Sequence, residues 1–159
     1  MAKDPDPTTL LHTLDGKSRS LDDWTTMFHM LLVVMPARPE VAPYLAIGSR
    51  ILHVFQGADC RGALLVTNNA DHTRRILGDA AERFLVFVDP QRQVVESLGL
   101  TRLPALVHLR QDASLAEAVE GWDPPAWRAL SARLATEMSW SHPMLPAPGD
   151  PPAFVGWAA

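Results

Sequence analysis

The apolar run from Met27 to Met35 restricts the possible folds most strongly, because only His29 interrupts it. Its length and its branched side chains suit one β-strand rather than a helix. A strand that is apolar on every residue must be buried on both of its faces, which is typical of the inner strands of parallel sheets. The run therefore predicts a sheet that helices cover on both sides.

Patterns of strand and helix alternate along the rest of the chain. Asp15-Gly16 predicts a hairpin turn within residues 10–20, and a short helical turn follows at 21–24. Further strands are expected at 63–67, 84–88, 105–109 and 115–120, and helices at 39–55, 70–77, 90–98 and 124–140. Asp89 is expected to cap the third of these helices and Pro90 to open it. This order predicts an α/β fold with a central mixed sheet that ends in an antiparallel edge strand.

Composition changes at both ends of the chain. Residues 1–9 form a polar, proline-broken arm, residues 10–140 carry the strand and helix patterns, and residues 141–159 contain five prolines. That density of proline forbids a regular helix and disfavours a strand, so an extended tail is expected. Phe154, Val155 and Trp157 are apolar residues in this tail, and they could dock on the domain or on a partner.

Charge and hydropathy limit the classes of partner. The formal net charge is -4 and there is no basic run, which argues against nucleic acid or an anionic membrane as the main partner. The N-terminal residues lack the apolar segment of a signal peptide, and the longest apolar run is too short to cross a bilayer. From these features we expect a soluble cytoplasmic protein.

The segment Met35–Leu45 resembles, in its spacing, the active-site segment of thioredoxin-like thiol–disulfide oxidoreductases. In that family a Cys-x-x-Cys motif precedes an Arg or Lys and then a Pro-x-Leu, which Pro43-Tyr44-Leu45 matches here. Counting back from Pro43, the two cysteine positions fall on Met35 and Arg38. The resemblance implies a degenerate member of this redoxin family.

Three further segments resemble the family in the same order. Residues 14–24 resemble the N-terminal hairpin of the redoxin and peroxiredoxin branch, residues 98–105 the loop with the family's cis-proline, and residues 119–122 its final strand. The resemblance implies a thioredoxin-like fold over residues 10–140, in which Pro104 is the cis-proline. In the family the backbone before this proline pairs with extended substrate segments. Leu103 would then offer its backbone to a peptide, unless Pro104 serves the fold alone.

The residues at the two motif positions cannot carry out the family's thiol chemistry. That chemistry needs a thiolate at a helix N-terminus and a second thiol one turn later. Met35 is a thioether and Arg38 has no redox chemistry. The first hypothesis is therefore a redox-inactive module without a cofactor that binds a protein or peptide partner, as a homodimer or an accessory subunit. The binding residues expected at this site are Met35, Pro36, Ala37, Arg38, Leu103 and Pro104.

Two alternatives remain open. Cys60, the single cysteine, could serve a one-cysteine reductase or peroxidase if Arg61 lowered its pKa, or it could be an inert and partly buried thiol. Arg38 could help a helix N-terminus to bind a small anion, or it could be a solvated side chain. Thiol reactivity and ligand-induced stabilisation separate these alternatives.

The six histidines are scattered along the sequence, and none has a second ligand at metal-binding spacing. We therefore expect no metal site. His29 and His108 lie in expected strands, where satisfied core or edge positions are the simplest interpretation. Trp122, Trp127 and Trp140 are expected to pack around the last helix, whereas an exposed tryptophan would indicate an interface.

Overall fold

The computed structural model describes residues 1–159 and is built on a seven-stranded sheet with the order β2-β1-β5-β4-β3-β7-β8. The strands of this sheet are β1 (Leu10–Thr13), β2 (Ser18–Ser20), β3 (His29–Met35), β4 (Cys60–Val66), β5 (Leu85–Val88), β7 (Ala105–Leu109) and β8 (Leu115–Glu120). The helices are α1 (Leu21–Thr25), α2 (Ala42–Phe55), α3 (Ala70–Leu77), α4 (Ala80–Arg83), α5 (Gln93–Leu98) and α6 (Pro124–Met138), with one 3₁₀ turn, η1 (Pro39–Val41). A separate pair of short strands, β6 (Arg102–Leu103) and β9 (Trp157–Ala158), completes the fold.

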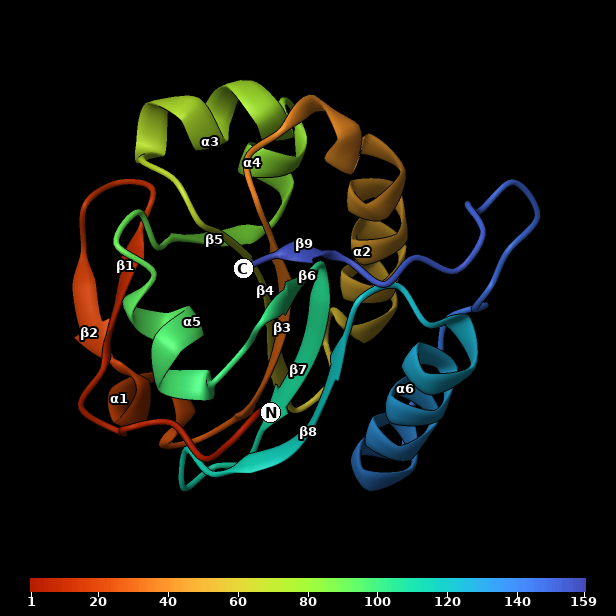
Figure 1. The fold of residues 1–159 in the computed structure, drawn as a ribbon. Coiled ribbons are helices and arrows are strands. Elements are labelled where there is room, and N and C mark those ends of the chain that lie inside the picture. Colours follow the sequence, from red (N-terminus) through yellow and green to blue (C-terminus); the bar gives the residue numbers. More distant parts are fainter.

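Strand β3 lies inside the sheet, and both of its faces are buried. Leu31, Val33 and Met35 belong to a core cluster that also contains residues of α2 and α6. The alternate residues of β3 belong to a second cluster, which contains residues of α1 and α5. Figure 1 shows these helix pairs on opposite sides of the sheet. The prediction that helices cover the apolar run on both sides is confirmed.

Pairing in the sheet is mixed, as the sequence predicts. Strand β3 is parallel to β4 and antiparallel to β7, and β4 is parallel to β5. Strand β8 pairs with β7 in the antiparallel direction and forms one edge of the sheet. The hairpin of β1 and β2 forms the other edge, with a left-handed glycine, Gly16 (φ +86°), in its turn. The expected α/β class is therefore confirmed.

Two expected helices begin later than the sequence indicates. The pattern at 39–55 divides into η1 and α2, with Pro43 in the first turn of α2, where a missing N–H is tolerated. Helix α5 begins at Gln93 rather than at Pro90. Arg92 adopts a left-handed conformation, and the Asp89 carboxylate reaches over this turn to accept from the Val94 amide. Asp89 thus caps the helix from a distance.

Both terminal segments pack against the domain. In the arm, the Lys3 amide donates to the Leu98 carbonyl, and the Asp4 carboxylate accepts from the Leu115 amide. The tail returns to the domain and ends as strand β9 beside β6, as Figure 1 shows in blue. Proline is expected to disfavour a strand in the tail, but the short strand β9 forms, because the five prolines all precede the residues that pair.

The three expected core tryptophans divide into two groups. Trp122 and Trp127 are buried and meet edge to face, with ring centroids 5.1 Å apart. Trp140 is 42% exposed, so the expectation that it packs in the core is wrong. Its indole N–H donates to the Val54 carbonyl near the end of α2, which attaches the start of the tail to that helix.

Candidate functional site

The residues expected to bind a partner lie around the end of β3. Met35 ends this strand, and the loop Pro36–Arg38 leads into η1. The antiparallel register of β3 with β7 pairs Val34 with Ala105, and one further step along both chains sets Met35 opposite Pro104. The Leu103–Pro104 peptide bond is cis, as the resemblance implies. The fold thus brings together sequence segments that are almost seventy residues apart.

Burial divides these residues into two kinds. The side chains of Met35 and Leu103 are in the core, at 0% and 1% exposed, so neither can touch a ligand without moving. The side chain of Arg38 is 43% exposed. A binding surface at this place therefore consists of the Arg38 guanidinium, the loop and the backbone edge before Pro104.

That backbone edge already carries an extended segment, which is the chain's own C-terminus. Strand β9 runs antiparallel to β6, with Trp157 opposite Leu103 and Ala158 opposite Arg102. The Ala159 amide continues the ladder by donating to the Thr101 carbonyl at 3.0 Å. The tail therefore occupies the position in which the resemblance places an extended substrate segment.

Aromatic side chains hold the tail against the start of α2. The ring of Phe154 stacks on Tyr44 with centroids 5.7 Å apart, and Trp157 meets Tyr44 edge to face at 5.7 Å. Phe154 and Trp157 also contact each other at 4.8 Å. The Arg38 guanidinium lies over the Trp157 ring, 4.7 Å from its centroid. Together these four residues form an aromatic clamp, in which each ring contact adds stabilisation beyond the area that it buries.

A second contact holds the middle of the tail at the end of β8. Trp122 and Phe154 exchange two backbone hydrogen bonds, of 2.7 and 2.9 Å. Gly121 permits this approach, because a Cβ built at that residue would lie 2.7 Å from the Val155 carbonyl oxygen. Gly121 also has a positive φ of 77°, which other residues rarely adopt. Gly121 thus makes room for the tail.

The upstream half of the tail is tied to α2 by an ion pair. The Asp150 carboxylate accepts two hydrogen bonds from the Arg50 guanidinium, and Asp150 Oδ2 also accepts from the Ala147 amide at 2.7 Å. The side chain of Asp150 is only 9% exposed. A charge-assisted, two-bond pair at a partly buried position is the strong form of such a contact. Residues 141–150 therefore pack on the domain independently of the aromatic clamp.

The anion interpretation of Arg38 receives no support from its contacts. Its guanidinium already lies 3.4 Å from the Glu40 carboxylate, and its face rests on Trp157. The helical turn that follows is a 3₁₀ segment of three residues. An incoming anion would have to displace a carboxylate that the chain itself supplies.

Cys60 has the surroundings of an inert thiol. It is 9% exposed at the start of β4, the end of the sheet opposite the Met35 loop. Burial raises the pKa of its thiol to about 12. The Arg61 guanidinium lies over the rings of Trp24 and Phe28, at 5.0 and 5.2 Å from their centroids. Desolvation therefore acts against thiolate formation here, and Arg61 is engaged with aromatic rings.

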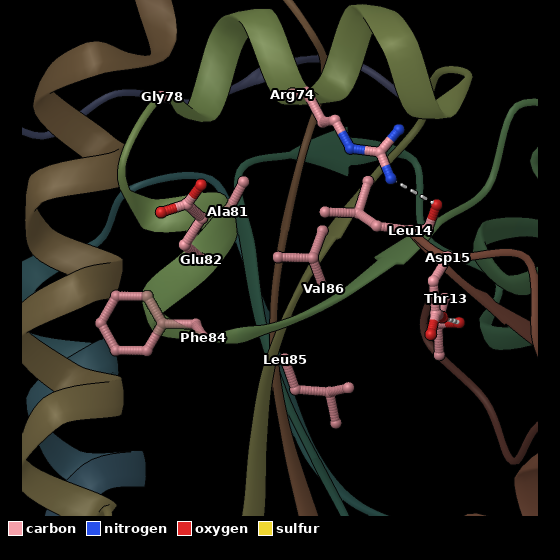
Figure 2. A pocket seen from close by; sticks show the side chains of 10 residues that line it. All are labelled: Thr13, Leu14, Asp15, Arg74, Gly78, Ala81, Glu82, Phe84, Leu85 and Val86. Atoms are coloured by element: carbon pink, nitrogen blue, oxygen red, sulfur yellow. Dashed lines mark hydrogen bonds between the residues drawn. The ribbon is translucent and has the colours of Figure 1, made fainter.

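Two hollows help to delimit the site. One, of about 410 Å³, lies between the β1–β2 hairpin and helices α3 and α4, where Arg74 donates to the Leu14 carbonyl (Figure 2). None of the expected binding residues lines it. The other, of about 330 Å³, lies beside the tail and is lined by Trp122 and Phe154 among others. The second hollow extends the candidate surface along the tail.

The sequence gives no sign that the chain's own tail pairs with the backbone edge before Pro104. The signal that was available is the cluster Phe154-Val155-Gly156-Trp157, which is apolar after a stretch rich in proline. In the sequence Tyr44 is only the variable residue of the Pro43-Tyr44-Leu45 match, although it is the base of the aromatic clamp. Pairing between residues 102 and 158 has no local pattern from which it could be read.

The solved structures that resemble this fold include a peroxiredoxin, a thioredoxin and a thiol:disulfide interchange protein. Peroxiredoxin Q from Xanthomonas campestris superposes with a TM-score of 0.68 at 11% identity, over 87% of this chain and 98% of the other. A protein from Chlorobium tepidum assigned as the thiol:disulfide interchange protein DsbE gives a TM-score of 0.70 at 15% identity, over 87% and 98% of the two chains. The exposed lipoprotein thioredoxin Etrx1 of Streptococcus pneumoniae gives 0.62 at 18%, over 79% and 97%. No protein-family model and no curated protein matches the sequence.

These similarities show that the chain has a thioredoxin-like fold. The mixed sheet, the helices on both faces and the cis peptide bond before Pro104 agree with that assignment. None of the helices is long and apolar enough to span a bilayer.

Proposed function

We propose that this chain is a redox-inactive thioredoxin-fold module that binds an extended protein segment at the edge before Pro104. The observation that carries the proposal is the pairing of β9 with β6 at this edge. It supports the view that the backbone of Arg102 and Leu103 accepts a strand by antiparallel addition. The aromatic clamp beside it suits a segment with bulky apolar residues.

Three side chains support the proposed loss of redox chemistry. Met35 stands at the first motif position and is a buried thioether, and Arg38 stands at the second. The remaining thiol, Cys60, is buried with a raised pKa. Neither disulfide exchange nor peroxide reduction has a nucleophile at the loop after β3.

The tail makes binding of a partner competitive. A segment on a short flexible linker is present at its own site at an effective concentration on the order of 1 mM. A separate peptide with the same intrinsic affinity must therefore reach millimolar concentration to displace it. A physiological partner would bind more tightly than the tail, or it would bind when the tail is released.

A synthetic peptide of residues 151–159 tests the proposal. Labelled with a fluorophore, it should bind the full-length Trp157→Ala variant at micromolar concentration, and it should bind the wild-type chain only near millimolar concentration. A matched peptide with Val155→Ala should bind equally well, because Val155 is 78% exposed. A peptide with Trp157→Ala should bind at least tenfold more weakly. Equal affinity of the wild-type chain and the variant for the first peptide would contradict the proposal.

A turnover assay tests the redox half separately. The chain should not accelerate the reduction of insulin by dithiothreitol or consume hydrogen peroxide in the presence of a thiol. The double variant Met35→Cys/Arg38→Cys is the matched gain-of-function control. Thiol-dependent turnover by the wild-type chain that Cys60→Ala abolishes would overturn the assignment in favour of a one-cysteine enzyme.

A further inference from the structure

A cluster of three potential metal ligands lies beneath the last turn of α6, at the end of β3 opposite the Met35 loop. His29 begins β3, His108 lies in β7, and Glu137 lies near the end of α6. One ligand atom from each of them lies within 4.8 Å of the other two. The three residues are far apart in the sequence, which is why the spacing of the histidines gave no sign of them.

We propose that His29, His108 and Glu137 bind one divalent zinc-type cation. The Nδ1 of His29 and the Nε2 of His108 face each other at 2.9 Å. In a tetrahedral zinc site with Zn–N bonds of about 2.0–2.1 Å, two ligand atoms lie about 3.3 Å apart. The two rings therefore need only a small movement to admit an ion between them. Glu137 Oε2, at 3.9 Å from His29 Nδ1, supplies the third ligand.

The burial of the three residues suits a metal site that solvent can reach from one side. His108 is 2% exposed, so it forms the inner wall of the site. The side chain of His29 is 20% exposed and that of Glu137 is 42% exposed, which leaves a path from solvent. The set of two histidines and one carboxylate leaves a fourth coordination position for water.

The neighbouring cations are engaged elsewhere. Arg133, one turn before Glu137 on α6, forms an ion pair with Glu117 of β8. Arg110 donates to the Leu115 carbonyl in the turn after β7. Both guanidinium groups thus have partners outside the three ligands, and Glu117 balances the charge of Arg133. Without an ion, the same geometry is a hydrogen bond between the two histidine rings.

The test is zinc binding by the full-length chain at pH 7.5, measured by competition with a chromophoric chelator. The wild-type chain should take up one Zn²⁺, and its Tm should rise with Zn²⁺ and fall again with EDTA. His29→Gln and Glu137→Gln, which change partly exposed side chains, should each weaken binding by about tenfold or more. His53→Gln removes an exposed histidine of α2, remote from the three ligands in the sequence, and should bind as the wild type does.

Two results would overturn the site. One is a wild-type chain whose Tm and chelator competition do not respond to Zn²⁺. The other is binding that His53→Gln weakens as much as His29→Gln does, since the ion would then be held elsewhere. The variants also separate this site from the peptide edge, because His29→Gln should leave binding of the 151–159 peptide unchanged.

Discussion

The Arg38 guanidinium rests on the face of Trp157, with its carbon 4.7 Å from the ring centroid. This contact joins the loop after β3 to the last residues of the chain, more than one hundred positions away. The same tryptophan pairs through its backbone with Leu103, beside the cis-proline. The loop that would carry a cysteine motif in a redox-active relative thus contacts the chain's own tail.

Replacing Trp157 should detach the end of the tail and leave the sheet intact. Trp157→Ala removes the cation–π contact and two aromatic contacts, which together are worth about 1.5–4 kcal/mol. In hydrogen exchange, the amides of Phe154 and Ala159 should exchange faster, because they donate to Trp122 and Thr101 only while the tail is docked. Val155→Ala is the control, since Val155 is exposed. Unchanged protection of both amides in Trp157→Ala would show that the ring does not hold the tail.

Gly121 should be far less tolerant of substitution than Gly149, although both have positive φ, at 77° and 90°. An alanine in the left-handed region costs about 1–2 kcal/mol at either place. At Gly121 its Cβ would also lie 2.7 Å from a tail carbonyl oxygen, whereas at Gly149 it would meet nothing within 4 Å. We expect Gly121→Ala to lower the free energy of unfolding by at least 1 kcal/mol more than Gly149→Ala, in urea titrations of both variants. Equal losses of unfolding free energy in the two variants would mean that the tail moves away from residue 121 without destabilising the protein.

Much of the fold follows from local patterns in the sequence. The apolar run Met30–Met35 predicts that both faces of β3 are buried, and Asp15-Gly16 predicts the β1–β2 turn. The N-cap of α6 is equally local, because the Asp123 carboxylate accepts from the Ala126 amide. These features depend on periodicity, turn chemistry and capping, which act within a few residues.

The features that were missed depend on contacts between distant segments. The pairing of Trp157 with Leu103 and the meeting of His29 with His108 each join residues of separate elements. No periodicity or spacing encodes such pairs. The start of α5 was misplaced for a local reason, since the Asp89 carboxylate caps over a left-handed Arg92 rather than directly before Pro90. Met35 was expected to bind, but its side chain is in the core.

Cys60 should resist modification until the chain unfolds. With a thiol pKa of about 12, only about one molecule in ten thousand carries the thiolate at pH 8. Iodoacetamide should therefore label the native chain far more slowly than the chain in 6 M guanidinium chloride, and mass spectrometry measures both rates. Rapid labelling of the native chain would contradict the burial and would revive the one-cysteine enzyme.

The titration of the Cys60 thiol should lower the free energy of unfolding at alkaline pH. Burial raises its pKa from the ordinary value of 9.0, so between pH 9 and pH 12 the unfolded chain loses a proton that the folded chain retains. The free energy of unfolding contributed by Cys60 is thus complete below pH 9 and declines as the pH rises through that window. Cys60→Ala, compared with the wild-type chain by urea unfolding at pH 8 and pH 10.5, should lose less stability between the two values. An equal loss would assign the alkaline decline to other groups.

The titration of His108 should lower the free energy of unfolding as the pH falls below neutral. Burial lowers its pKa from 6.5 to about 4, against the attraction of Glu137, and the charges of His29, Arg110 and Arg133 act in the same direction as burial. The unfolded chain therefore binds a proton near pH 6.5 that the folded chain takes up only near pH 4. Stability contributed by the neutral ring is present above pH 6.5 and is lost as the pH falls through this window.

The variant His108→Gln isolates this contribution, because glutamine does not titrate and still offers a hydrogen bond to His29. Urea unfolding at pH 7.0, 5.5 and 4.5, with EDTA present to exclude metal ions, should show a smaller loss of stability for this variant than for the wild-type chain. The comparison depends on how steeply the free energy of unfolding changes with pH. It therefore holds even though glutamine packs less well and lowers stability at every pH. His53→Gln, at an exposed position on α2, should keep the wild-type slope. A wild-type slope in His108→Gln would show that another buried group takes up the proton, because the linkage relation requires the slope to vanish with the group that causes it.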